Sequence, residues 1–147
     1  MKKLFFIWAV LLSGFAAFAQ DTDKLFNSYI SVKNALVDGD HKAASQAIGT
    51  FYQSLKSDES FVRKDELLKA AETLRKASGI EKQRAAFNDV SVIMWELVKG
   101  SDKISQAVYY QYCPMKKAYW LSREMEIKNP YYGSSMLTCG KVIEAKK

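Results

Sequence analysis

The chain has 147 residues, 26% of them charged, and a formal net charge of +6. That length suits a single globular domain with a hydrophobic core of its own. The lysines and arginines are spread among acidic residues, as in Arg63-Lys64-Asp65-Glu66, so we expect an ordinary solvated surface rather than the clustered basic face that nucleic-acid binding needs.

The first nineteen residues predict a secretory signal peptide. Met1-Lys2-Lys3 is basic, an apolar run extends from Leu4 to about Phe15, and Ala17-Phe18-Ala19 offers small residues for cleavage. The apolar run is too short to span a bilayer, and polar sequence follows at once. We therefore expect cleavage after Ala19, a periplasmic domain over residues 20–147, and no stable membrane anchor.

Four amphipathic helices are expected in the first hundred residues, because apolar side chains recur there every three or four positions. Short connections between them favour an antiparallel bundle of about four helices. The predicted helices cover about Leu25–Leu36, Ala44–Leu55, Leu67–Leu74 and Ile80–Leu97, with Gly39, Gly79 and Gly100 near their ends.

After Gly100 the composition changes, since six of the eight tyrosines lie between Tyr109 and Tyr132, together with Trp120. Residues 107–113 predict a short extended segment, residues 129–133 predict a turn, and residues 142–143 could form another short strand or a packed tail. We therefore expect a mainly α protein, a helical bundle with a small, mostly irregular aromatic C-terminal cap.

The only two cysteines lie beside methionines, in Tyr112-Cys113-Pro114-Met115 and in Met136-Leu137-Thr138-Cys139. Thiolate and thioether sulfurs are soft ligands that select Cu(I) and similar ions. If the chain folds back between the two segments, Cys113, Met115, Met136 and Cys139 can surround one ion. The residues therefore suggest a Cu(I) site.

The same two cysteines could instead form a disulfide, because an exported protein meets an oxidising environment. A Cys113–Cys139 disulfide would stabilise the fold by roughly 3–4 kcal/mol, and Met115 and Met136 would then be ordinary apolar side chains. The residue types leave both alternatives open.

Catalysis is not expected. His41 is the only histidine, it is predicted to be a surface residue, and no nucleophile motif accompanies it. The sequence has no Gly-rich phosphate loop and no Cys-x-x-Cys redox pair.

The C-terminal segments also carry a resemblance to a known family. The ordered strings are Tyr112-Cys113-Pro114-Met115, Trp120-Leu121-Ser122, Glu126-Ile127-Lys128-Asn129-Pro130-Tyr131-Tyr132-Gly133 and Met136-Leu137-Thr138-Cys139-Gly140, with Val32–Val37 and Gln83–Phe87 upstream. Together they resemble the bacterial DUF3347 domain over nearly all of residues 20–147.

The resemblance implies metal handling, because DUF3347 domains occur as small exported proteins and on periplasmic adaptors of copper- and silver-type efflux systems. The Tyr-Cys-Pro-Met string is similar to the heavy-metal-binding motif of such adaptors, in which histidine stands where this chain has Lys116. We therefore expect Cu(I) binding, with an efflux adaptor as the partner. A reduced cysteine pair would hold the ion, and an oxidised pair would release it.

Overall fold

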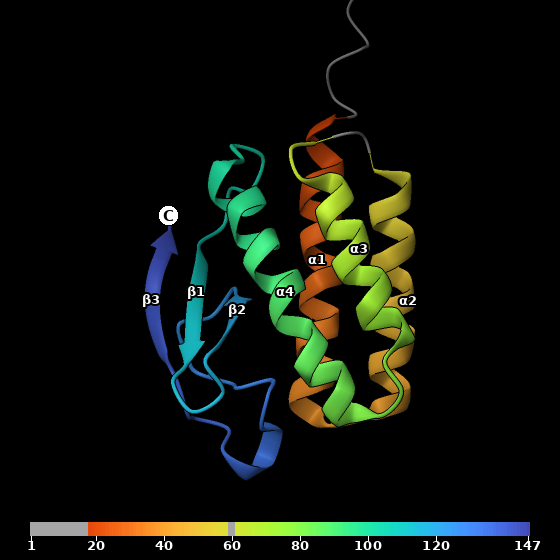
Figure 1. Ribbon diagram of the computed structural model, residues 1–147. Coiled ribbons are helices and arrows are strands. Elements are labelled where there is room, and N and C mark those ends of the chain that lie inside the picture. Colours follow the sequence, from red (N-terminus) through yellow and green to blue (C-terminus); the bar gives the residue numbers. More distant parts are fainter. Residues whose placement is uncertain (1–17, 59–60) are drawn as a thin grey trace, which may run out of the picture.

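The computed structural model describes residues 18–58 and 61–147. Within these residues lie four α-helices and a three-stranded antiparallel sheet (Figure 1). The helices are α1 (Phe18–Asp38), α2 (His41–Ser57), α3 (Lys64–Lys76) and α4 (Ile80–Gly100). The strands are β1 (Val108–Cys113), β2 (Ala118–Ser122) and β3 (Lys141–Lys146), and a short 3-10 helix, η1 (Gly133–Ser135), precedes β3.

The predicted helices are all present. Most of the expected signal peptide, residues 1–17, lies outside the described residues, while residues 18 and 19 begin α1. Among the residues that the structure describes, no helix combines the length and apolar character that a membrane crossing requires.

The turn between α1 and α2 follows directly from its sequence. Gly39 adopts a φ of 75°, a left-handed conformation that glycine tolerates, and its amide donates to Ala35 O. The Asp40 carboxylate then caps α2 by accepting from the backbone amides of Lys42 and Ala43. Two residues thus end one helix and start the next.

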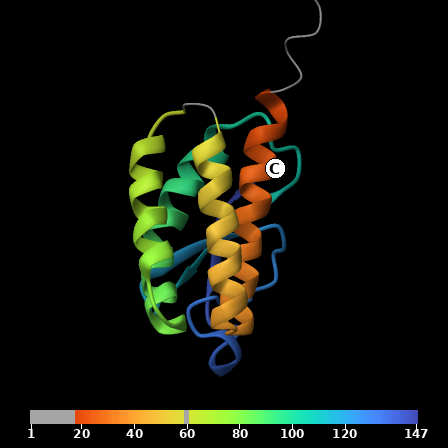
Figure 2. The same cartoon turned by 90° about the vertical axis from the view of Figure 1, so that its right-hand side faces the viewer.

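Each helix packs against its neighbour in sequence, and α1 also contacts α4. Figure 2 shows α1, α2 and α3 in front of the sheet. A buried tyrosine joins the helices to the sheet, because the Tyr29 hydroxyl lies 2.7 Å from Ser91 Oγ and accepts from the Leu121 amide at 3.0 Å. Burial raises the pKa of Tyr29 well above its usual value, so the hydroxyl stays protonated.

The sheet corrects the expectation of a mostly irregular C-terminal cap. β1 forms where an extended segment was predicted, and the residues expected to be a short strand or a packed tail lie in β3. β2 was not predicted. The strand order is β2-β1-β3, so β1 lies in the centre, and its register with β3 shifts between Tyr110 and Gln111.

Stacked aromatic rings hold one face of the sheet against α4. The Trp95 ring of α4 lies 4.8 Å from Tyr110, which lies 5.1 Å from Tyr119 on the neighbouring strand. Tyr112 extends the row, 4.7 Å from Tyr119. Ring contacts of this kind add to the stabilisation from burial.

Candidate functional site

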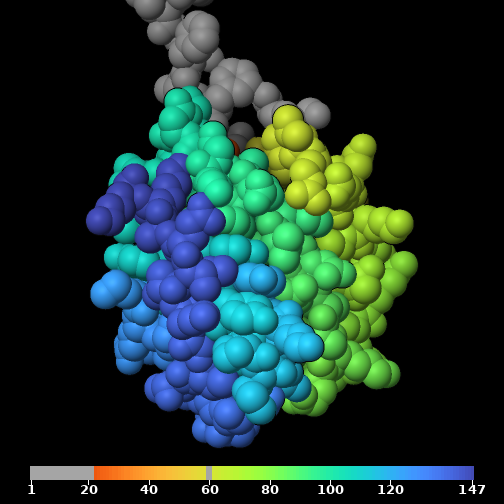
Figure 3. All heavy atoms as spheres, turned by 60° about the vertical axis from the view of Figure 1, so that its left-hand side comes forward, coloured from red at the N-terminus to blue at the C-terminus, as the bar shows by residue number. Residues whose placement is uncertain are grey.

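The two cysteines meet at the end of the sheet. Cys113 is the last residue of β1, and Tyr112 beside it pairs with Lys141, the first residue of β3. Because Cys139 precedes Lys141 by two residues, it reaches Cys113, and the two sulfurs lie 3.8 Å apart. Both cysteines are free, since a disulfide needs sulfurs about 2.05 Å apart. Figure 3 shows the C-terminal segment, in blue, lying against residues in cyan that include those of β1.

Asn129 holds the segment that carries Cys139. Its side-chain amide is buried, donates to Cys139 O at 2.6 Å and accepts from the Tyr131 amide at 2.8 Å. Its backbone amide donates to Leu137 O at 2.8 Å. One asparagine thus fixes the chain on both sides of η1, and with it the position of the Cys139 backbone.

Gly140 lets the segment approach the sheet closely. A Cβ atom at this position would lie 2.7 Å from the Trp120 ring and 3.1 Å from Tyr112 O, and the φ of Gly140 is 153°. No other residue fits there without displacing its neighbours. The fully buried indole of Trp120 therefore packs against Gly140, the residue that follows Cys139.

The two thiols have different surroundings. Cys113 is fully buried, and its sulfur accepts a hydrogen bond from the Lys116 amide at 3.4 Å. Cys139 is half-buried, and its pKa is raised by desolvation, then by its hydrogen bond to Cys113 and by the charge that Cys113 can carry. A hydrogen bond from the Met115 backbone opposes this increase in the pKa of Cys139. Desolvation and the neighbouring Cys113 thus both favour the protonated form of the Cys139 thiol.

The two methionines lie at the rim of the thiol pair. The backbones of both residues contact Cys139, since Met115 hydrogen-bonds to its sulfur and Met136 O accepts from its amide at 3.1 Å. Their side chains are 65% and 40% exposed, respectively. The structure thus brings the two thiols together and leaves the two thioethers exposed to solvent.

The described residues contain no group of three or more His, Cys, Asp or Glu side chains arranged to hold a metal ion. A soft ion at this site would therefore have the two thiolates as its protein anchor. Thioethers or groups from outside the chain would complete its coordination. His41 is exposed, as predicted, and its Nδ1 lies 3.1 Å from Gln83 Oε1.

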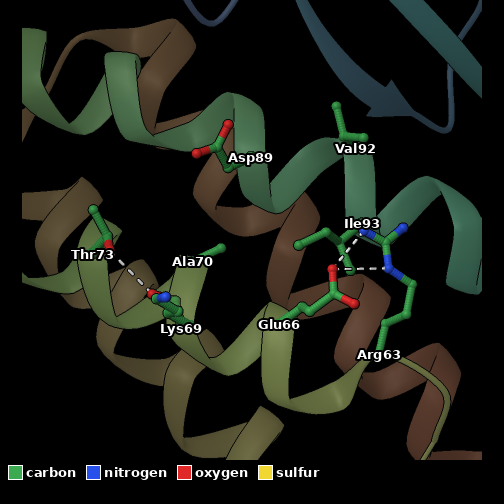
Figure 4. Close-up of a pocket in the computed structure, with 8 residues that line it drawn as sticks. All are labelled: Arg63, Glu66, Lys69, Ala70, Thr73, Asp89, Val92 and Ile93. Carbon is green, nitrogen blue, oxygen red and sulfur yellow. Dashed lines mark hydrogen bonds and ion pairs between the residues drawn. The ribbon is translucent and has the colours of Figure 1, made fainter.

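A separate groove of about 440 Å³ lies between α3 and α4 (Figure 4). Its cationic Arg63 is already paired with Glu66, whose carboxylate accepts at 2.7 Å. None of the sulfur-containing residues lines this groove. It therefore contributes nothing to the thiol site.

The sequence did not identify Asn129 or Gly140 as parts of the site. Both belong to segments that were noted for other reasons, Asn129 as the start of a turn and Gly140 as part of a family string. An asparagine before proline and a glycine after cysteine were the available signals. Neither signal indicates a distant contact partner.

Comparison with known proteins identifies a matching family. The family model described as "Protein of unknown function (DUF3347)" matches residues 25–106. This range includes Val32–Val37 and Gln83–Phe87 and ends before β1, so the cysteine-containing strings lie outside it. No curated protein and no solved structure matches the chain.

Proposed function

This chain belongs to the DUF3347 family, and we propose that it is an exported periplasmic protein that binds Cu(I) or a similar soft ion. It would buffer the ion or pass it to a heavy-metal efflux system, without catalysing a reaction. The observation that carries the proposal is the pair of free thiols, Cys113 and Cys139, whose sulfurs lie 3.8 Å apart.

The sulfur separation fits a shared ion. Two thiolates bound to one tetrahedral metal ion, each at about 2.3 Å, lie about 3.8 Å apart. The Cys113 and Cys139 sulfurs therefore need little movement to share an ion. Soft sulfur ligands favour Cu(I) over the hard cations.

The surroundings of the thiols support loading and release. Cys113 is buried beside the Lys116 amide, which stabilises negative charge on its sulfur, while Cys139 lies partly open to solvent. An ion arriving from solvent would meet Cys139 and displace its proton, since thiolates rather than thiols bind metals. The exposed thioethers of Met115 and Met136 could hold the ion briefly as it enters or leaves.

The remaining parts of the chain have proposed roles in this function. Residues 1–19 would direct export and be removed, and residues 20–147 would form the mature domain. The four helices would form an antiparallel bundle that supports the sheet and the thiol pair. The partner would be a periplasmic adaptor of an efflux system, as the family resemblance implies.

A second candidate function rests on the same separation of the Cys113 and Cys139 sulfurs. The sulfurs would have to approach from 3.8 Å to about 2.05 Å to form a disulfide. In that case Cys113–Cys139 would be a structural disulfide, and the chain would be an interaction module without a metal.

A competition titration tests the proposal. Fully reduced protein is titrated anaerobically against a chromogenic Cu(I) chelator, alongside Cys113→Ser, Cys139→Ser and the matched control Met125→Leu, which changes another exposed methionine. We expect one Cu(I) ion per chain, a large loss of affinity in each cysteine variant, and no change in the control. Equal affinity in all four proteins would refute the proposed ligands.

A further inference from the structure

A small cleft lies between the first half of α4 and the turn that joins β1 to β2. Its volume is about 310 Å³. Arg84 and Asn88 of α4 form one wall, Lys116 and Lys117 of the turn form the other, and Tyr131 also lines it. This volume is at the lower end of the range for ligand pockets, so it suits one or two side chains of a partner.

The lining of this cleft is positively charged. Its one carboxylate, Glu81, is already neutralised by Arg84 at 2.8 Å. Arg84 also donates to Leu36 O and Pro130 O, so it has a structural role.

Two ammonium groups remain available at the cleft. Lys117 is exposed and has no side-chain partner among the described residues. Lys116 is also exposed, and its only such contact within the described residues is with the Tyr132 ring, whose centroid lies 4.8 Å from its Nζ. Across the cleft, Asn88 Oδ1 accepts from the Tyr119 amide, which leaves the NH2 group of Asn88 as a donor. The free groups of this cleft are therefore donors, and the two that are charged are cations.

The cleft and the thiol pair share a residue. The Lys116 amide donates to Cys113 Sγ at 3.4 Å, while the Lys116 side chain lines the cleft. A segment that binds the Lys116 side chain in the cleft would therefore contact the same residue whose backbone contacts Cys113.

We infer that this cleft is a docking site for an acidic segment of a partner protein, whose carboxylates pair with Lys116 and Lys117. The argument is charge complementarity, since carboxylates are the groups that two unpaired ammonium groups and an amide NH2 recognise together. The inference rests on the proposed function only in taking that partner to be the protein that receives the ion. Docking there would bring the partner to the thiol pair.

The test uses the reduced, metal-free chain and a fluorescein-labelled hexaglutamate peptide, with binding followed by fluorescence anisotropy at low and at physiological salt. Lys116→Gln/Lys117→Gln is compared with Lys42→Gln/Lys103→Gln, which removes the same charge from two other exposed lysines. We expect roughly tenfold weaker binding in the first double variant and unchanged binding in the second.

Two controls define the ligand class. Labelled hexaglutamine should not bind, and a single-stranded oligonucleotide of equal charge should bind more weakly than hexaglutamate. Equal weakening in both double variants, equal binding of the oligonucleotide, or no binding of hexaglutamate would each overturn the inference. Because no metal is present, these results are independent of the Cu(I) titration, and either proposal can fail while the other stands.

Discussion

Replacing Asn129 with alanine should release the segment that carries Cys139 without unfolding the helices. The buried Asn129 amide donates to Cys139 O and accepts from the Tyr131 amide. Asn129→Ala removes both hydrogen bonds and leaves both backbone groups without their partner. The affected groups all lie between β2 and β3, outside the four helices.

The magnitude follows from these two hydrogen bonds. A buried amide that loses its partner, as at Tyr131, costs about 1–3 kcal/mol, and the part-buried bond to Cys139 O adds about 1 kcal/mol. We therefore expect the free energy of local opening to fall by about 3 kcal/mol. At about 1.4 kcal/mol per factor of ten, the open state becomes roughly a hundred times more populated.

Thiol labelling measures this opening. Cys113 is fully buried, so an alkylating reagent reaches it only when the segment opens. The reaction is followed by mass spectrometry on reduced protein under native conditions, with Asn34→Ala, an exposed asparagine, as the control. We expect Cys113 to react roughly a hundred times faster in Asn129→Ala and at the wild-type rate in the control. Equal rates in both variants would refute the role that we assign to Asn129.

Three further predictions concern the fold. Tyr29→Phe leaves a backbone amide of β2 unpaired in the core, so the free energy of unfolding in guanidinium should fall by about 1–3 kcal/mol, and an unchanged value would contradict this. Gly140→Ala should lower the free energy of unfolding by about 1–3 kcal/mol through overpacking, whereas Gly49→Ala, where a Cβ meets nothing within 4 Å, should not lower it. The pKa of Glu72 is lowered from 4.5 to about 2, chiefly by its hydrogen bond from Arg75, so its stabilisation is present above pH 4.5 and lost as the pH falls towards 2. The difference in melting temperature between wild type and Glu72→Gln should therefore shrink as the pH is lowered from 4.5 towards 2. A difference of unchanged size at pH 2 would contradict the stabilising role assigned to the Glu72 carboxylate.

The helices could be predicted because their signals are local. Apolar side chains that recur every three or four positions predicted the buried face of each helix. Gly39 and Asp40 predicted the turn between the first two helices. β2 could not be predicted, because its hairpin lacks the usual turn residues. Lys117 adopts a φ of 51°, a left-handed conformation for which glycine or asparagine is the normal signal.

The candidate site, like the fold, could be predicted from the sequence only in part. The residue types that could bind a soft ion are visible in the sequence, and so is the turn at residues 129–133 that returns the chain. The burial of Cys113 and the exposure of Met115 are not visible, because they depend on the register of β1 with β2 and β3. The hydrogen bond from Asn129 to Cys139 O joins residues ten positions apart, and no local pattern encodes it.

X-ray absorption at the copper edge tests the central claim most directly. The reduced chain is loaded with one equivalent of Cu(I), and the neighbours of the ion are determined in wild type, Cys113→Ser and Cys139→Ser. We predict that sulfur atoms alone surround the ion in the wild type, and that each variant loses one of them. An ion surrounded by nitrogen or oxygen, or a sulfur count that neither variant lowers, would contradict binding by Cys113 and Cys139.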